Sequence, residues 1–124
     1  MRSRRAVKVC LLLAALWALP AACGRTTTVG RARSIQVTLS EYRLAPQKLH
    51  ATAGPLTIVA HNFGRLVHNL AITQGGRLQA ETAPIRPGGS VILSLYLPAG
   101  GYVLASNLLD DQSLGIYGTL TVSS

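Results

Sequence analysis

Few side chains of this 124-residue chain could bind a metal ion or transfer a proton. The chain contains three histidines, four acidic residues and two cysteines. His50 and His61 have neither metal-ligand spacing to each other nor a partner motif, so we expect ordinary surface or strand-end roles for both. The remaining candidates are one histidine, one serine and an acidic pair: His68, Ser106, Asp110 and Asp111.

A serine, a histidine and an aspartate raise the hypothesis of a hydrolase. Ser106 would be the nucleophile and His68 the base, and Asp111 would orient that base. Such a site also requires a strained turn at the nucleophile and donors directed at an oxyanion. The sequence around Ser106, Leu-Ala-Ser-Asn-Leu, lacks the Gly-x-Ser-x-Gly pattern of such a turn. We therefore expect no enzyme activity and keep a hydrolase as the lowest alternative.

Residues 1–22 have the three-part pattern of a secretory signal peptide. Four basic residues come first, an apolar run over residues 9–19 follows, and small residues precede Cys23. The apolar run is shorter than the ~20 residues that a membrane-spanning helix needs. We predict that the mature chain is exported across the cytoplasmic membrane and lies on its extracytoplasmic face.

The segment Leu-Pro-Ala-Ala-Cys, which ends at Cys23, resembles a bacterial lipoprotein cleavage box, in which small residues precede a cysteine that becomes the lipidated N-terminus. Pro20 departs from the usual pattern. The alternative is ordinary signal cleavage, which would leave a free, reactive thiol. Cys10 lies within the signal, so the two cysteines form no internal disulfide. We predict attachment to the membrane through a lipid on Cys23.

Residues 23–33 comprise the predicted lipid-attachment cysteine and a polar stretch without helix or strand periodicity, which we interpret as a flexible tether. Its three arginines are expected to touch anionic lipid as well. Of the twelve basic residues, four lie in the predicted signal, which leaves eight basic and four acidic residues and a net charge of +4 rather than +8. Because the sequence has no dense basic stripe with interleaved aromatic residues, we expect no nucleic-acid binding.

Residues 34–124 fit one all-β domain. Ile35, Val37 and Leu39 alternate with polar residues, as in a strand with one buried face. Turn-forming Gly, Pro and Asn residues separate this strand from six further predicted strands, at residues 49–52, 56–61, 67–73, 91–97, 102–106 and 116–122. Seven to eight short strands at this spacing predict a β-sandwich with one core between two sheets.

Two segments of this domain carry a more specific pattern. Residues 62–72 begin with an Asn-x-Gly turn and continue through His68 and Asn69 into an apolar strand. Residues 101–122 contain a Gly-Tyr pair, Ser106, a short acidic loop, Gly-Ile and an alternating final strand. Both resemble the signatures of the cupredoxin family of blue-copper proteins, which includes plastocyanin and azurin. The resemblance covers roughly residues 34–124 and implies a Greek-key β-sandwich.

The resemblance also implies what has become of the copper ligands. His68 holds the first ligand position, and Asn69 is the residue that usually ties the two loops together. Ser106 stands at the Cys position and Ile116 at the Met position, and the second His falls on Asp110 or Asp111. An alcohol and an alkyl group do not replace the thiolate and the axial ligand of a blue-copper site. We therefore expect no intact type 1 copper site.

The leading functional hypothesis is a binding or accessory module that contacts an unknown protein or small ligand. The contact would be made through the pole, the end of the domain at which the cupredoxin family binds copper. Exposed apolar residues in a solvent-facing loop often mark such a partner site. In this loop the candidate patch consists of Leu108, Leu109, Leu114 and Tyr117.

Two other roles remain open for the polar residues of the pole. In the first, His68 with Asp110 and Asp111 binds copper weakly, without the blue colour, in a copper-handling protein. In the second, His68 hydrogen-bonds Ser106 or Asp111 and holds the loops together, and the chain carries no cofactor.

Overall fold

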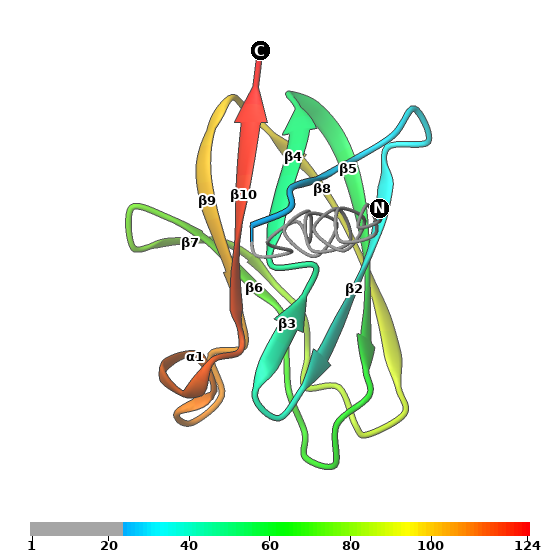
Figure 1. Cartoon of the computed structure of the whole chain (residues 1–124), viewed down its shortest axis with the longest axis vertical. Coiled ribbons are helices and arrows are strands. Elements are labelled where there is room, and N and C mark those ends of the chain that lie inside the picture. Colours follow the sequence, from blue (N-terminus) through cyan, green and yellow to red (C-terminus); the bar gives the residue numbers. More distant parts are fainter. Residues whose placement is uncertain (1–23) are drawn as a thin grey trace, which may run out of the picture.

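The computed structural model describes residues 24–124, which form two β-sheets packed face to face (Figure 1). One sheet has six strands in the order β1-β4-β10-β9-β6-β7, and the other has four in the order β3-β2-β5-β8. The strands are β1 (Thr27–Thr28), β2 (Ser34–Ser40), β3 (Arg43–Ala45), β4 (Lys48–Thr52), β5 (Gly54–Asn62), β6 (Ala71–Gln74), β7 (Arg77–Glu81), β8 (Ser90–Leu97), β9 (Gly100–Ala105) and β10 (Tyr117–Ser123). A single short helix, α1 (Asp111–Leu114), precedes β10 within the described residues.

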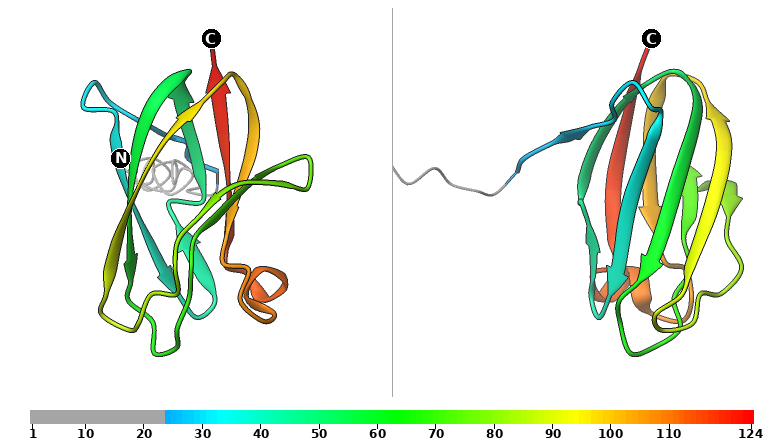
Figure 2. Two further views of the ribbon diagram at one scale, coloured as in Figure 1. Left: turned by 180° about the vertical axis from the view of Figure 1, so that it is seen from behind. Right: turned by 90° about the vertical axis from the view of Figure 1, so that its right-hand side faces the viewer.

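Alternating burial explains why these segments pair as sheets. In β2 and β5 every second side chain is buried, so each strand has one apolar face that must pack on the opposite sheet. β5 lies between β2, with which it pairs in parallel, and β8, with which it pairs antiparallel. The right-hand view of Figure 2 shows the strands of both sheets along the long axis of the molecule.

The core lies between the two sheets and draws on almost every strand. Its largest fully buried apolar side chains are Leu39, Leu44, Ile58, Leu70, Ile72, Leu104, Ile116 and Leu120. Burial of apolar side chains of this size stabilises a fold by about 1.5–3 kcal/mol each relative to exposure. The residues described therefore contain a complete sandwich core.

The all-β sandwich predicted from the sequence is confirmed, but seven to eight strands is too few. β1, β3 and β7 have two, three and five residues, and their sequences are too short or too polar to show a periodic pattern. The predicted strand at residues 67–73 is also wrong in part, because the strand begins only at Ala71. Before it, the backbone of His68 pairs with Ile85 in an isolated bridge.

The segment interpreted as a flexible tether differs from that expectation from Thr27 onward. β1 pairs in parallel with β4, and the amide of Val29 donates to the carbonyl of His50 over 2.8 Å. The side chain of Arg33 donates to Thr52 and to the carbonyl of Pro55. The predicted signal peptide and Cys23 lie outside the described residues, and none of the described helices is long and apolar enough to cross a membrane.

Four connections meet at one end of the sandwich, at the bottom of Figure 1. They are residues 41–42, 63–70, 82–89 and 106–116, and we call this end the pole. α1 lies in the last of them. The pole therefore brings together segments that lie far apart in the sequence, such as those of Glu41 and Asp111, which are 70 residues apart. Both segments that carry the family signatures contribute to it.

Candidate functional site

His68 is the centre of the pole and is completely buried. Its backbone amide donates to the carbonyl of Ile85 over 3.2 Å, and the amide of Ile85 donates back to the carbonyl of His68 over 2.7 Å. This two-bond bridge joins the loop of residues 63–70 to the loop of residues 82–89. It fixes the direction in which the imidazole enters the pole.

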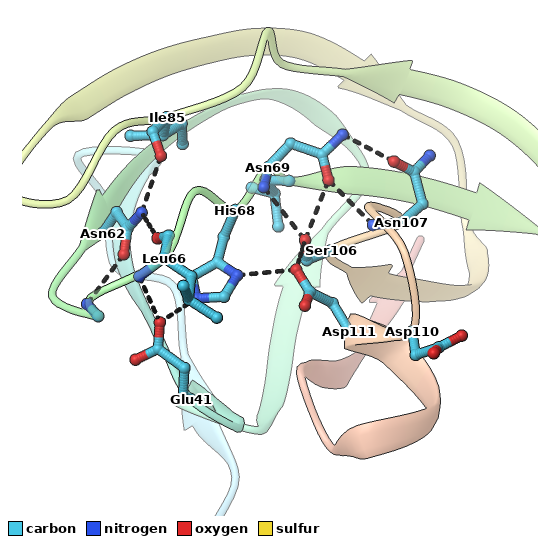
Figure 3. Close-up of polar contacts among 12 residues, drawn as sticks. Glu41, Asn62, Leu66, His68, Asn69, Ile85, Ser106, Asn107, Asp110 and Asp111 are labelled. Atoms are coloured by element: carbon cyan, nitrogen blue, oxygen red, sulfur yellow. Dashed lines mark hydrogen bonds and ion pairs between the residues drawn. The ribbon is translucent and has the colours of Figure 1, made fainter.

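Both nitrogens of the His68 ring face carboxylates (Figure 3). Nδ1 lies 2.7 Å from Oδ2 of Asp111, and Nε2 lies 2.8 Å from Oε1 of Glu41. A carboxylate oxygen accepts hydrogen bonds, so each ring nitrogen faces an acceptor. His68 is thus a buried ring held between two carboxylate groups.

Glu41 is anchored by backbone amides as well as by His68. Its carboxylate accepts hydrogen bonds from the amide of Arg65, at 2.9 and 3.0 Å, and from the amide of Leu66, at 2.7 Å. Donation from the Arg65 amide is the largest cause that lowers the pKa of Glu41 to about 2. A Cβ on Gly64 would lie 2.5 Å from Oε1 of Glu41, which explains the glycine in the Asn-x-Gly turn.

Ser106 is fully buried and bonds to Asp111 rather than to His68. Its hydroxyl lies 2.6 Å from Oδ2 of Asp111, and it accepts a hydrogen bond from the amide of Asn69 over 3.1 Å. A serine nucleophile requires its hydroxyl to contact the base directly. Here the carboxylate stands between the serine and the histidine, so the order of the three groups differs from that of a catalytic triad.

Asn69 ties the two signature loops together, as the resemblance implied. Its Oδ1 accepts from the amide of Asn107 over 2.9 Å, and its Nδ2 donates to Oδ1 of Asn107 over 2.7 Å. Nδ2 of Asn107 donates in turn to Glu81 over 3.1 Å. Asn62 has a similar role, since its Nδ2 donates to the carbonyls of Leu66 and Ile85, both at 2.8 Å.

The polar interior of the pole is saturated with hydrogen bonds. Within residues 24–124, no buried side-chain nitrogen or oxygen lacks a partner. An unpaired buried polar group costs about 1–3 kcal/mol, so a complete set of partners stabilises the pole relative to a set with gaps. The cluster is therefore built as a cross-link between loops.

The residues that the resemblance assigns to the ligand positions do not fit a copper ion in this arrangement. Oδ2 of Asp111 fills the point at which the side chains of Ser106 and His68 converge. Both nitrogens of His68 are engaged, and Ile116 offers no donor. No group of three or more His, Cys, Asp or Glu residues with metal-binding geometry occurs among the residues that the structure describes.

Most residues of this cluster are predictable from the sequence, but one choice stays open there and one residue carries no signal. Asp111 is buried against His68, whereas Asp110 is exposed and its side chain points away from the cluster in Figure 3. The hydrogen-bond alternative for His68 is confirmed for Asp111. Glu41 was missed because it lies 27 residues before His68 in a turn without a motif. Gly64 of the Asn-x-Gly turn points to Glu41 only once the close contact between that glycine and the carboxylate is known.

The other two histidines lie outside this cluster. His61 sits on the outward face of β5, where its ring contacts Ser90 and Gln36 and stacks on Phe63 at a centroid distance of 5.8 Å. His50 bonds the hydroxyl of Ser123 over 3.0 Å. Both match the strand-surface roles expected from the sequence.

Apolar side chains surround the closed polar cluster on its solvent side. Leu109 is 99% exposed and has a positive φ of 50°, while Leu114 is 54% and Tyr117 43% exposed. A shallow depression of about 530 Å³ is lined by Leu109, Gln112, Ser113 and Tyr117. On the neighbouring loops further large apolar side chains are exposed: Tyr42, Phe63, Leu66 and Val67. We call these residues, with Leu109, Leu114 and Tyr117, the apolar rim.

The fold has clear relatives among solved structures, although no family model and no curated protein sequence matches the chain. An auracyanin from Roseiflexus castenholzii is 20% identical with a TM-score of 0.70, over 77% of this chain and 100% of that one. Auracyanin A from Chloroflexus aurantiacus, described as a blue copper protein, is 19% identical with a TM-score of 0.67, over 77% of this chain and 99% of that one.

A rusticyanin from Thiobacillus ferrooxidans is 17% identical with a TM-score of 0.64, over 81% of this chain and 83% of that one. Likenesses at this identity establish the arrangement of the strands rather than the chemistry at the pole. They agree with the two signature segments and with the two-sheet architecture. The chain therefore has the cupredoxin fold.

Proposed function

We propose that this chain is an extracytoplasmic binding or accessory module that holds a protein partner against the apolar rim of its pole. The observation that carries the proposal is the exposure of the rim, above all of Leu109 at 99%. An apolar side chain presented to water in this way gains free energy when a partner covers it. The partner expected on chemical grounds is a protein surface with a complementary apolar patch.

The buried polar cluster beneath the rim also supports this proposal. Reactive groups must reach solvent or a ligand. His68 and Ser106 are instead fully buried, and both contact Oδ2 of Asp111. The same hydrogen bonds hold the loops that carry the rim. A rim on fixed loops loses less conformational entropy on binding than a rim on mobile loops, and so it binds more tightly for the same contact area.

The anchoring of the module belongs to the same proposal. The pattern of residues 1–22 and the cysteine at position 23 support export followed by lipid attachment. A lipid on Cys23 would keep the module on the extracytoplasmic face of the membrane. The partner would then be sought among proteins of that compartment.

Site-specific photo-crosslinking in the producing cells tests the partner proposal. A photoreactive side chain at Leu109 should give one dominant adduct of discrete mass, because the rim faces the partner. The matched control is Ile92, which is 66% exposed on β8 and lies outside the rim. Leu114→Asp in the Leu109-labelled chain should remove the adduct, because burying an unpaired carboxylate at an apolar interface is costly.

Two results would contradict this proposal. One is an adduct that forms equally from Leu109 and Ile92, since contact would then be unspecific. The other is an adduct that survives Leu114→Asp in a chain whose fold, measured by circular dichroism, is unchanged. Binding of a small molecule rather than a protein would appear as no adduct at Leu109.

A further inference from the structure

A second surface, on the side of the sandwich, carries a concentration of positive charge. Arg25, Arg43 and Lys48 are exposed around a depression of about 550 Å³ whose remaining lining is uncharged, with Thr27 and Gln47 among it. These residues come from the segment before β1, from β3 and from the beginning of β4. We call Arg25, Arg43 and Lys48 the basic side.

The charge of the basic side is not compensated within the described residues. Among residues 24–124, no arginine or lysine pairs with a carboxylate. The two contacts between a basic side chain and a carboxylate in that range are those of His68. The four acidic residues of the sequence lie elsewhere: Glu41 and Asp111 contact His68, Glu81 contacts Asn107, and Asp110 is in the acidic loop of the pole. The basic side therefore attracts anions without competition from its own neighbours.

The position of Gly24 relates the basic side to the predicted lipid-attachment cysteine. A Cβ on Gly24 would lie 3.5 Å from Nζ of Lys48, so the segment before β1 runs beside the basic side. Cys23 is the next residue, and consecutive Cα atoms are about 3.8 Å apart. A lipid on Cys23 would thus enter the membrane next to Lys48, with too little chain between them for the sandwich to stand away from the surface.

We propose that the basic side docks on anionic lipid headgroups. Each cation near a negatively charged membrane surface strengthens attachment about fivefold, and three such cations lie together here. The segment that carries β1 leaves the side of the sandwich in the right-hand view of Figure 2, while α1 and the loops of the pole lie at its lower end. Docking by this side would place the loops of the pole in the layer next to the membrane.

The inference rests on the proposed lipid anchor for the orientation alone, and the two are tested separately. The chain from Gly24 to Ser124 contains every residue of the core and carries no lipid, so its binding reports the basic side without the anchor. Its partition is measured by vesicle sedimentation at low ionic strength. The vesicles are phosphatidylcholine alone or an equimolar mixture of phosphatidylcholine and phosphatidylglycerol.

The expected result is partition onto the mixed vesicles that weakens as salt is added, with little onto phosphatidylcholine alone. Arg43→Ala with Lys48→Ala should lower the partition about twenty-five-fold, since two cations are lost at roughly fivefold each. The matched control is Arg77→Ala with Arg86→Ala, which removes the same charge from exposed positions outside the basic side. That control should lose much less.

Equal losses in the two double variants would overturn the proposal, because net charge alone would then explain the binding. Equal partition onto both kinds of vesicle would also overturn it, because the attraction would then be independent of lipid charge. Both variants replace exposed side chains that make no hydrogen bond or ion pair in the described structure, so both should unfold at the temperature of the parent chain. The lipid anchor stands or falls independently, by labelling of Cys23.

Discussion

Asp111→Ala removes the acceptor that His68 and Ser106 share. Oδ2 of Asp111 lies 2.7 Å from Nδ1 of His68 and 2.6 Å from the Ser106 hydroxyl, so the variant leaves a buried imidazole and a buried hydroxyl each short of one partner. Leaving a buried polar group without its partner costs about 1–3 kcal/mol, and two such groups are affected here. Since a domain of this size has a total stability of about 5–15 kcal/mol, the loss is a large fraction of it.

Urea unfolding measures this loss, with Asp110→Ala as the matched control. Asp110 is the adjacent residue with the same side chain, but it is exposed and makes no side-chain hydrogen bond. We expect Asp110→Ala to change the free energy of unfolding by no more than about 0.5 kcal/mol. A loss in Asp111→Ala as small as that in Asp110→Ala would refute the idea that the cluster cross-links the pole.

A double-mutant cycle separates the pair from its surroundings. His68→Ala removes the imidazole, so in the Asp111→Ala background it no longer breaks the contact between the two side chains. The cost of His68→Ala should therefore be smaller in that background than in the parent chain, by about 0.5–3 kcal/mol. Additive costs would show that the two side chains stabilise the pole independently.

Three further predictions concern acid stability, copper and the anchor. The pKa of Glu41 is lowered in the folded chain from its ordinary value of 4.5 to about 2. Its contribution to stability is therefore complete above about pH 4.5 and is lost as the pH falls towards 2; Glu41→Gln should remove this part of the acid dependence, and an unchanged pH profile would contradict it. Titration with Cu(II) should give no blue absorption band and no saturable binding beyond that of His68→Ala; one-to-one binding that His68→Ala abolishes would instead establish a remodelled metal site. Cys23→Ser should abolish metabolic lipid labelling and release the chain from the membrane, and persistent labelling would rule out the lipoprotein prediction.

Local patterns in the sequence predicted the architecture where one face of a strand is buried. Over residues 34–40 the alternation of apolar and polar side chains gives the strand directly, because its period of two matches the two faces of a sheet. The same reasoning fails for β1, which has two residues and pairs only because β4 offers an open edge. It also fails for residues 67–70, where hydrogen bonds to the loop of residues 82–89 replace a ladder.

The polar cluster was predictable only as far as the two signature segments reach. His68, Asn69 and Ser106 lie in those segments, and the resemblance brought them to one pole. Glu41 lies outside both, and its contact with His68 depends on how a turn of one sheet meets a loop of the other. The choice between Asp110 and Asp111 depends on the direction of α1, which loop length alone does not determine.

The scarcity of acidic residues links the pole to the basic side. The sequence has four acidic residues. Two of them contact His68, and a third accepts a hydrogen bond from Asn107. A carboxylate used in this way inside the pole is not available to neutralise an arginine or lysine on the surface. The same distribution of charge therefore stabilises the loops that carry the apolar rim and leaves Arg25, Arg43 and Lys48 exposed to an anionic surface. If the pole binds a partner and the basic side binds lipid, the two surfaces select different ligands. The rim is apolar and favours an apolar protein patch, whereas the basic side is charged and favours anionic headgroups.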